Sequence, residues 1–372
     1  MNSRSQSSKT EAPLAGAKSS GRERQAPKRV AVLVDHFAET FVSGDPAAPA
    51  QSTLRIIEAL ETLGYEPCEL SLQEDKIVDW LQALIDGDFD LAFNLCETVG
   101  GRAQGEHLAA GAVELLEIPM TGASAATLLL CLDKDRCAAM LRANGITVPD
   151  WIVVDGAHPL PEDFDRFPSM VKPAAEDASN GVHSTSVVTS LPETLAAVAR
   201  IRETWDKVVI QDFIEGREIN LAIVGDSLLP PAEIDFSTLP HEAPPIVSFA
   251  AKWKPESTDY QGTVPVCPAD LPPQQAEELQ RLAGRAWRLM DGRGYARVDV
   301  RLTSDGIPYV IDINPNPDLS LDAGLARQAR VAGWSYDELI RKVVDCALNG
   351  MHTSPASDWT ILQPVAVGEA VS

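Results

Sequence analysis

The feature that most constrains the fold of this 372-residue chain is a pair of alternating apolar runs, joined by Asp305-Gly306, in the segment ARVDVRLTSDGIPYVIDIN (296–314). An Asp-Gly dipeptide between two such runs is a strong signal for a two-residue β-hairpin loop with a type I′ turn. Two antiparallel strands are therefore expected, and the position of the turn fixes which residues face each other. The expected register pairs Ser304 with Ile307, Thr303 with Pro308, Arg301 with Val310, Asp299 with Asp312 and Arg297 with Asn314.

This register sets two carboxylates, Asp299 and Asp312, directly opposite each other on the polar face of the hairpin. Opposed like charges destabilise a sheet, so the pattern indicates a compensating cation. Two carboxylates and the amide of Asn314 form an all-oxygen ligand set that suits Mg²⁺. The hairpin alone fits equally an edge hairpin whose polar face is solvated. The apolar face is expected to carry Val298, Val300, Ile311 and Ile313.

The composition limits the class of protein. The net charge is −23, and residues 1–29 carry seven Lys or Arg against two Glu, so the rest of the chain is more acidic still. Nucleic-acid binding, which needs a basic surface, is therefore not expected. The six cysteines are scattered, without a CxxC pair, which argues against a zinc site and a disulfide framework. Because no apolar run reaches membrane-spanning length and no secretory signal is visible, we expect a cytoplasmic protein without a membrane segment.

Strands and helices alternate in the first part of the chain, which predicts an α/β protein with a parallel sheet, and the length predicts more than one domain. The β-branched run RVAVLVD and the run FDLAFNLCE are typical of buried parallel strands. A parallel sheet binds ligands at the carboxyl ends of its strands. We expect a disordered tail over 1–28, a first domain over 29–122, a second over 123–205, a third over 206–350 and a tail over 351–372.

Six motifs follow one another along the chain: LDK (132–134), VKPAAEDASNG (171–181), VIQDFIEGREINLAI (209–223), AAKWKPESTDYQGTVPVCPADL (250–271), ARVDVR (296–301) and VIDINPNPDLS (310–320). In this order, over roughly residues 29–348, the chain resembles the ATP-grasp superfamily and, within it, the D-alanine–D-alanine ligase family. The resemblance implies a three-domain α/β ATP-grasp architecture with an N-terminal parallel-sheet, Rossmann-like domain. It implies ATP between the second and third domains, and it says much less about the substrate.

The resemblance implies that three isolated lysines, Lys134, Lys172 and Lys252, bind the phosphates of ATP. The loop EDASNG (176–181) follows the strand of Lys172 and would close over the γ-phosphate, with Ser179 as its catalytic member. Backbone N–H groups of such a loop can cradle phosphates. Taken alone, Lys134 is better explained as a solvated lysine on a helix, so its assignment depends on the order of the motifs.

The resemblance also implies which residues bind the nucleoside part of ATP. The segment of Gln211, Asp212 and Ile214 resembles the strand edge that binds adenine, and Glu218 matches the acid that binds the ribose hydroxyls. A glutamate in a strand is otherwise a common surface residue. The assignment of Glu218 therefore depends on the spacing of the motif EGREIN (215–220).

The hairpin residues acquire roles from the same resemblance. Asp299, Asp312 and Asn314 resemble the triad that ties Mg²⁺, with Mn²⁺ as an alternative, to the ATP phosphates. Arg297 resembles the arginine that stabilises the tetrahedral intermediate. In the implied reaction a substrate carboxylate attacks the γ-phosphate to give an acyl phosphate and ADP. An amine then displaces phosphate, and an amide or peptide bond remains.

The substrate side departs from the D-alanine ligases. Asp177 and Ala178 stand where a glycine and a serine are usual, and Asp318 stands where those ligases have a glycine. Ala323 occupies the position of a serine that binds a substrate carboxylate. In the first domain, the segment FNLCETVGGRAQGE (93–106) replaces a histidine-containing glycine loop.

Three residues are assigned to the substrate: Glu97, just past the end of a strand of the first domain, Trp253, where the resemblance implies a substrate-contacting aromatic residue, and Asp318. The sequence thus predicts a ligase that joins a small-molecule carboxylic acid to an amine or amino acid other than a D-alanine pair. Three alternatives stay open: a true D-alanine–D-alanine ligase, an ATP-dependent phosphotransferase on the same fold, and a nucleotide-binding protein without catalysis. The last is disfavoured because the metal triad, Arg297 and all three lysines are present. The oligomeric state is open, a homodimer included.

Overall fold

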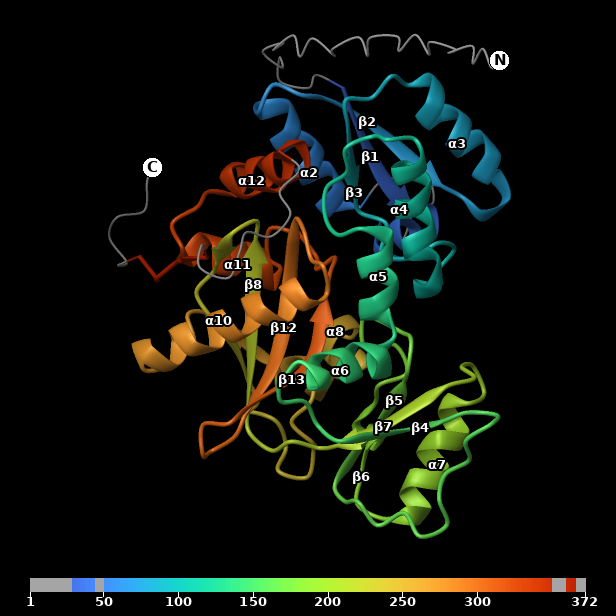
Figure 1. Ribbon diagram of the computed structural model, residues 1–372, viewed down its shortest axis with the longest axis vertical. Coiled ribbons are helices and arrows are strands. Elements are labelled where there is room, and N and C mark those ends of the chain that lie inside the picture. Colours follow the sequence, from blue (N-terminus) through green and yellow to red (C-terminus); the bar gives the residue numbers. More distant parts are fainter. Residues whose placement is uncertain (1–28, 44–49, 350–358, 366–372) are drawn as a thin grey trace, which may run out of the picture.

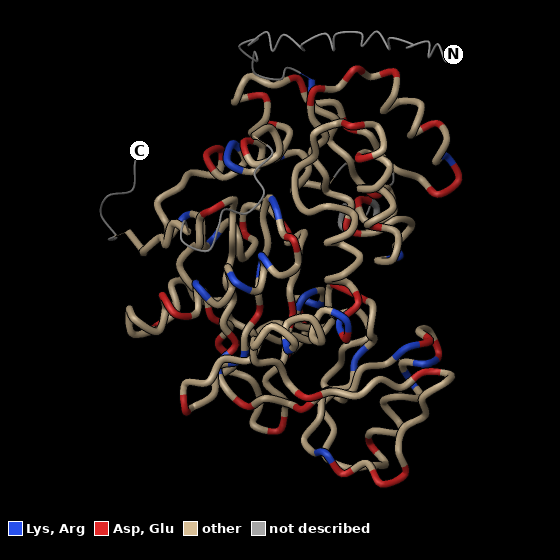
Figure 2. Tube along the Cα trace, viewed as in Figure 1, with Lys and Arg blue, Asp and Glu red and all other residues tan. Residues whose placement is uncertain are grey.

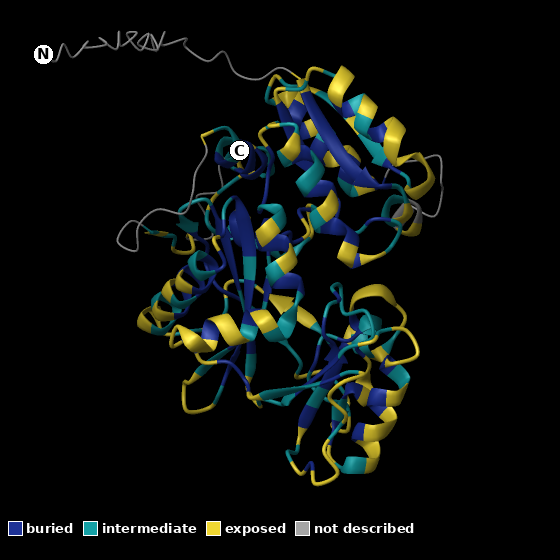
Figure 3. Ribbon diagram, turned by 45° about the vertical axis from the view of Figure 1, so that its right-hand side comes forward, coloured by how far each residue is buried: buried dark blue, intermediate teal, exposed yellow. Residues whose placement is uncertain are grey.

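The computed structural model describes residues 29–43, 50–349 and 359–365, which form the three sheets and their covering helices seen in Figure 1. The tail expected over 1–28 lies outside the described residues. Figure 2 shows acidic residues spread over the outside of all three parts of the chain, in keeping with its net charge of −23. Figure 3 shows that the central strands of the sheets are largely buried and that the helices expose one side to solvent.

The first sheet is parallel, as the buried apolar runs predicted. Its strand order is β2-β1-β3, and both neighbours run parallel to β1, whose residues Val30 to Val34 are almost completely buried. A sheet buried on both faces requires near-continuous apolar strands, which explains the run RVAVLVD. The elements of this part are β1 (Arg29–Asp35), α1 (His36–Ser43), α2 (Gln51–Thr62), β2 (Glu66–Leu72), η1 (Glu74–Lys76), α3 (Ile77–Asp86), β3 (Leu91–Asn94), η2 (Ala103–Gly105) and α4 (Glu106–Leu115).

Two helices link the first sheet to the rest of the molecule. Helix α5 (Ala125–Leu132) packs on α4 and on β13 (Pro308–Asn314), and α6 (Lys134–Ala143) packs on β13 and on α10 (Pro273–Leu289). Although the sequence placed these helices in the second domain, their apolar sides join a core that runs from the first sheet to the third. The position of α6 matters for function because Lys134 is its first residue.

The second sheet has the antiparallel order β4-β7-β5-β6. Its strand β7 lies beyond residue 205, where the second domain was expected to end, because the apolar run 208–212 pairs with both β4 and β5. We therefore propose that the second domain extends to about residue 212. The elements are β4 (Trp151–Val154), β5 (Ser169–Pro173), η3 (Ser184–Ser186), β6 (Val187–Val188), α7 (Leu191–Ile201) and β7 (Val208–Asp212).

The third sheet is the largest, with the order β11-β10-β8-β12-β13, and β9 pairs with β8 while β14 pairs with β9. Strand β14 corrects the expectation of a patternless tail over 351–372. Residues 360 and 361 pair with β9, and Trp359 stacks on Arg288 at 5.0 Å. The elements are β8 (Arg217–Val224), β9 (Ser227–Leu228), β10 (Ala232–Asp235), α8 (Phe249–Trp253), α9 (Thr258–Gln261), β11 (Val264–Val266), α10 (Pro273–Leu289), β12 (Tyr295–Leu302), β13 (Pro308–Asn314), α11 (Gly324–Val331), α12 (Tyr336–Leu348) and β14 (Thr360–Ile361).

The hairpin β12–β13 has the expected register only in the half that is remote from the turn. Arg297 faces Asn314 and Asp299 faces Asp312, as predicted. Nearer the turn every pair is shifted by one residue, and a β-bulge lies between the two halves. The observed pairs there are Val300 with Val310, Arg301 with Tyr309 and Leu302 with Pro308.

The loop explains the shift. Thr303 N–H donates to the carbonyl oxygen of Ile307 at 3.1 Å, so the loop has three residues rather than two. Only Gly306, with φ +80°, adopts the left-handed conformation, whereas a type I′ turn needs two such residues. The bulge at Ile311 restores the register, and as a result Val310 enters the core while Ile311 turns to a cavity.

Candidate active site

A cavity between the second and third sheets gathers the residues predicted for nucleotide, metal and catalysis. Its walls come from β5 and the loop after it, from β7 and β8, from the segment before and within α8, and from β12 and β13. All twelve residues predicted for these three roles line it: Lys134, Lys172, Ser179, Gln211, Asp212, Ile214, Glu218, Lys252, Arg297, Asp299, Asp312 and Asn314.

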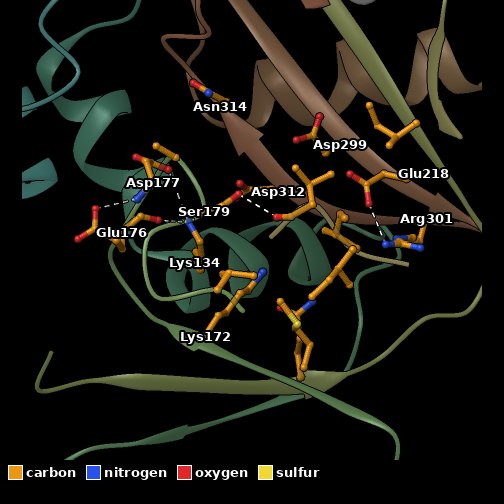
Figure 4. Close-up of a pocket in the computed structure, with 18 of the residues that line it drawn as sticks. Lys134, Lys172, Glu176, Asp177, Ser179, Glu218, Asp299, Arg301, Asp312 and Asn314 are labelled. Atoms are coloured by element: carbon orange, nitrogen blue, oxygen red, sulfur yellow. Dashed lines mark hydrogen bonds and ion pairs between the residues drawn. The ribbon is translucent and has the colours of Figure 1, made fainter. Parts of the chain in front are cut away.

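Lys134 is held among carboxylates at one end of the cavity. Its Nζ donates to the carbonyl oxygen of Glu176 at 2.6 Å and lies 3.6 Å from Asp177 and 3.7 Å from Asp312 (Figure 4). Burial disfavours the charged amine, but Asp312 and Asp177 outweigh it and raise the pKa of Lys134 above its ordinary value. Lys134 is therefore positively charged and is also held in one position by its partners, unlike a solvated lysine on a helix.

Lys172 is the opposite case. It is buried on β5, and burial together with the neighbouring charge of Lys134 lowers its pKa to about 8, against the pull of Asp312. A buried ammonium that lacks full compensation favours the arrival of an anion. Lys252, the third lysine, lies at the exposed edge of the same cavity.

The loop 176–181 is held over the cavity by its own side chains and by the third domain. Glu176 accepts hydrogen bonds from Asp177 N–H at 3.1 Å and from the Trp205 indole at 2.9 Å. Ala178 and Ser179 both have positive φ, 54° and 60°, a conformation that is uncommon outside glycine. The Ser179 hydroxyl donates to the carbonyl oxygen of Val247 at 2.9 Å, so in this arrangement it fastens the loop.

The hairpin supplies the oxygen atoms of the predicted metal site. Asp299 accepts two hydrogen bonds from Arg297, at 2.7 and 2.8 Å, and one from Asn220 at 2.8 Å. Burial opposes ionisation of Asp312, but Lys134, Lys172 and Arg297 together hold its pKa below the ordinary range. The repulsion expected between the two carboxylates is thus compensated by protein cations.

These oxygens fit a magnesium ion that arrives with a nucleotide. Within the described residues no group of three or more His, Cys, Asp or Glu is arranged to hold a metal. Mg²⁺ commonly binds through one or two carboxylates and completes its coordination with phosphate oxygens and water. Asp299, Asp312 and the amide of Asn314 would hold it, although Asn314 also accepts from Asn316 N–H at 2.9 Å.

The nucleoside end of the cavity lies along β7 and β8. Asp212 is bound by Arg166 through Nε at 2.9 Å, and the N–H groups of Asp212 and Phe213 donate to Asp150 and Pro168. These two amides are therefore occupied, and the next amide along the edge is that of Ile214. Across the cavity, Glu218 forms an ion pair of 2.8 Å with Arg301.

The three residues assigned to the substrate lie outside the set that lines this cavity, but they adjoin it. The Glu97 side chain is exposed to solvent at the mouth of the cleft. Partial loss of water there, together with the nearby charge of Asp318, raises its pKa to about 7, and Lys252 and Arg297 oppose the shift. The Trp253 indole donates to the carbonyl oxygen of Ala178 at 3.1 Å. Because Asp318 and Arg297 both act on the Glu97 carboxyl, the substrate side opens next to the predicted catalytic arginine.

Several residues of the site were missed by sequence reasoning. Asn316 donates to Glu106 at 3.0 Å and to the carbonyl oxygen of Cys96 at 3.2 Å, and thus fixes the residue before Glu97 to the third domain. Asn220 donates a hydrogen bond to Asp299, and Arg301 forms an ion pair with Glu218. A signal was present for the last two, because each lies two residues from a predicted site residue on the same face of its strand.

Comparison with known proteins decides the family. The family model described as D-ala D-ala ligase C-terminus matches residues 140–345. The chain belongs to the D-alanine–D-alanine ligase family. It is 30% identical over 329 residues to a D-alanine–D-alanine ligase of Dechloromonas aromatica, with 86% of this chain and 98% of that protein covered. It is 28% identical over 325 residues to one of Halorhodospira halophila, with 86% and 96% covered.

The solved structures agree on the fold. A D-alanine–D-alanine ligase from Bacillus anthracis complexed with ATP matches with a TM-score of 0.68 at 24% identity, over 88% of this chain and 99% of that one. The three-part architecture is therefore that of ATP-grasp ligases, and the chain is an ATP-dependent ligase that forms carbon–nitrogen bonds. In the described residues no helix has the length and apolarity needed to span a membrane.

Proposed function

We propose that this ligase joins a small carboxylic acid to an amine through an acyl phosphate, with ATP and Mg²⁺. The observation that carries the proposal is the meeting of three lysines, Arg297 and two carboxylates from separate elements in one cavity. Membership of a ligase family supports ATP use, and the ligase of Bacillus anthracis is known in complex with ATP. Neither identifies the acid or the amine.

The chain's own residues suit the first step by charge and position. Transfer of a phosphoryl group needs positioning and compensation of charge rather than covalent help from the protein. Lys134 and Lys172 would bind the phosphates inside the cavity, and the loop 176–181 would cover the phosphates and exclude water. Bound Mg²⁺ would neutralise charge on the transferring phosphoryl group.

In the second step an amine nitrogen attacks the acyl carbon, phosphate leaves, and the nitrogen gives up a proton. Arg297 is fixed by its two bonds to Asp299, which aims the guanidinium at the cavity beside the hairpin. A rigid donor of this kind can stabilise the oxyanion of the tetrahedral intermediate. Glu97, with a pKa of about 7, suits the general base that takes the proton.

The acceptor is best matched by an amine with additional positive charge, or by one that lacks a free carboxylate. Asp318 lies near Glu97, and its Oδ1 accepts from Ser320 N–H at 2.7 Å, which fixes the carboxylate. Ala323 caps helix α11 without any side-chain hydrogen bond, so it offers no hydroxyl to a substrate carboxylate. A hydrogen bond to a charged group contributes about 1.5–3 kcal/mol, or one to two decades in affinity.

A true D-alanine–D-alanine ligase is the second candidate, and the observation that favours it is the likeness to such ligases over 86% of the chain. The test is phosphate release together with mass detection of the product, using D-alanine, simple amines and basic amino acids as acceptors. We expect poor D-alanyl-D-alanine formation and a better rate with a cationic acceptor. Efficient D-alanyl-D-alanine synthesis, with no better acceptor in the panel, would establish the second candidate instead. A phosphorylated product without an amide would indicate a phosphotransferase.

A further inference from the structure

Arg301 is a buried arginine in the wall of the proposed nucleotide cavity to which neither the sequence nor the proposed reaction assigns a role. It lies on β12 on the same face as Arg297 and Asp299, and only 4% of the residue is exposed. Its neighbour across the sheet on β8 is Glu218, the predicted ribose ligand. Figure 4 shows the two side chains facing each other at one end of the cavity.

The guanidinium of Arg301 is fixed from several directions. A planar guanidinium can donate several hydrogen bonds in one plane while aromatic rings pack on its faces. Such a side chain cannot turn away from its partner carboxylate without losing several interactions together. Its contacts are Glu218 Oε2 at 2.8 Å from Nη2, Pro245 O at 2.5 Å from Nη2, Gly216 O at 3.1 Å from Nη1, and the rings of Phe213 and Phe236 at 5.6 and 5.5 Å from Cζ.

Arg301 is the countercharge that Glu218 contacts directly, through the 2.8 Å ion pair. Glu218 is 7% exposed, and burial raises the pKa of its carboxyl, while Arg301 is the largest opposing influence. An ionised carboxylate accepts hydrogen bonds only, whereas a protonated one also donates. The ribose of a nucleotide presents hydroxyl groups, which are best bound by an acceptor whose position is fixed.

We propose that Arg301 is a positioning residue for the ribose of the nucleotide: through the ion pair it holds the Glu218 carboxylate in place and turned to the cavity. Oε2 is committed to the guanidinium, so Oε1 is the atom left to accept from a ribose hydroxyl. This inference rests on the proposed nucleotide site. It predicts that Arg301, without touching the base or the phosphates, sets the preference for ribonucleotides over deoxynucleotides.

The experiment measures binding rather than turnover, so that it does not depend on the unknown substrates. A non-hydrolysable ATP analogue and its 2′-deoxy and 3′-deoxy forms are titrated calorimetrically, with Mg²⁺, into the full chain. The variants are R301M, R301K, E218Q and the double variant R301M/E218Q. The matched control is R217M, because Arg217 is the residue next to Glu218 on β8, it pairs with Glu233 of β10, and neither Arg217 nor Glu233 lines the cavity.

The wild type is expected to bind the ribonucleotide about tenfold or more tightly than at least one deoxy form, as a hydrogen bond to a charged group implies. R301M should reduce that ratio as far as E218Q does, and the double variant should reduce it no further. R301K should retain part of the ratio, and R217M all of it. If R301M unfolds, the ratio of ribonucleotide to deoxynucleotide affinity is compared in R301K and in the double variant, which removes both charges.

The experiment distinguishes failure of the proposed nucleotide site from failure of the inference about Arg301. A wild type that does not bind the analogue at all contradicts the proposed nucleotide site. A wild type that binds and discriminates, together with an R301M variant that binds more weakly but keeps the full ratio, overturns the inference alone. In that case Arg301 would serve only to hold together the segments around it, at residues 213–218, 236 and 245.

Discussion

Replacement of Asp312 by asparagine tests the metal site and the electrostatics of the cavity in one variant. The side chain keeps its shape but loses its charge. In the structure Asp312 faces Asp299 across the hairpin and lies 3.7 Å from Lys134. The variant therefore removes a countercharge of a buried lysine as well as an oxygen ligand of the proposed magnesium ion.

The effect on stability follows from the ion pair. Exposed pairs contribute about 0.2–1 kcal/mol, and loss of one partner of a fully buried pair costs about 3–5 kcal/mol. This pair is intermediate, since the side chains of Lys134 and Asp312 are 12% and 30% exposed, and Asp177 remains 3.6 Å from the lysine. We expect D312N to lose about 1–2 kcal/mol of unfolding free energy.

The hairpin pattern by itself predicts the opposite sign for the change in stability. Two opposed carboxylates should repel, so removing one should hold or raise the stability. In the structure Asp299 is already neutralised by Arg297 and hydrogen bonded to Asn220. Little repulsion is therefore left to relieve, and the attraction of Asp312 to Lys134 dominates.

The pH dependence supplies a second check on the sign. Protein cations, chiefly Lys134, hold the pKa of Asp312 below its ordinary value against the effect of burial. A carboxyl with a depressed folded-state pKa contributes stability above its unfolded-state pKa and loses it as the pH falls through the folded-state value. The difference between wild type and D312N in urea midpoint should therefore be largest near neutral pH and shrink under acid conditions.

The effect on activity should be much larger. Loss of an anchor for a metal that compensates phosphoryl charge removes several kcal/mol of transition-state stabilisation, and about 4 kcal/mol corresponds to roughly a thousandfold in rate. The assay is ATP-dependent phosphate release with varied Mg²⁺, on the same preparations as the urea curves. D305N is the matched control, because Asp305 is exposed at the tip of the same hairpin. A D312N variant with normal turnover, or one that is more stable than the wild type at pH 7, would refute this reasoning.

Three further variants test the remaining charges of the site. K172M should gain stability of the order of 3 kcal/mol below pH 8, because burial lowers the pKa of Lys172 from 10.5 to about 8. That gain in stability should vanish towards pH 10.5, and the calorimetric affinity for ATP should fall. D177N should bind the ATP analogue more tightly than the wild type, because Lys134 loses a competitor 3.6 Å away; an unchanged Kd contradicts this. E97Q should abolish the fall in ligase rate as the pH drops below about 7, since Glu97 has a pKa of about 7; an unaltered pH–rate profile would exclude it as the base.

Much of the nucleotide cavity could be predicted because its residues belong to short local patterns. Successive side chains of a strand point to opposite faces, so recognising the strand is enough to place Arg297 and Asp299 on the same face. A hairpin register then carries that face to Asp312 and Asn314. The order of the six motifs placed Lys134 and Lys172 near the same ligand, and the structure brings both to one cavity.

The errors arose where a distant or subtle interaction decided the structure. The turn at Gly306 has one more loop residue than an Asp-Gly pattern suggests, and only the bulge at Ile311 returns the register to its expected value. Strand β7 belongs to the second sheet because of its partners, not its composition. The partner of Arg301 is on another strand, 83 positions away in the chain, and no local pattern connects them.

The acidic residue in the phosphate loop shows how such distant interactions alter a family pattern. A glycine at position 177 would leave Lys134 with Asp312 as its carboxylate partner in the cavity, whereas Asp177 supplies a second one at 3.6 Å. The lysine bridges the two, and it also binds the backbone oxygen of Glu176, so it ties the loop to the hairpin. An incoming phosphate must compete with Asp177 for this charge, while Lys172 remains only partly compensated beside it. The two lysines thus have different roles: Lys134 holds the loop near the site, and Lys172 offers a buried positive charge that an incoming anion would compensate.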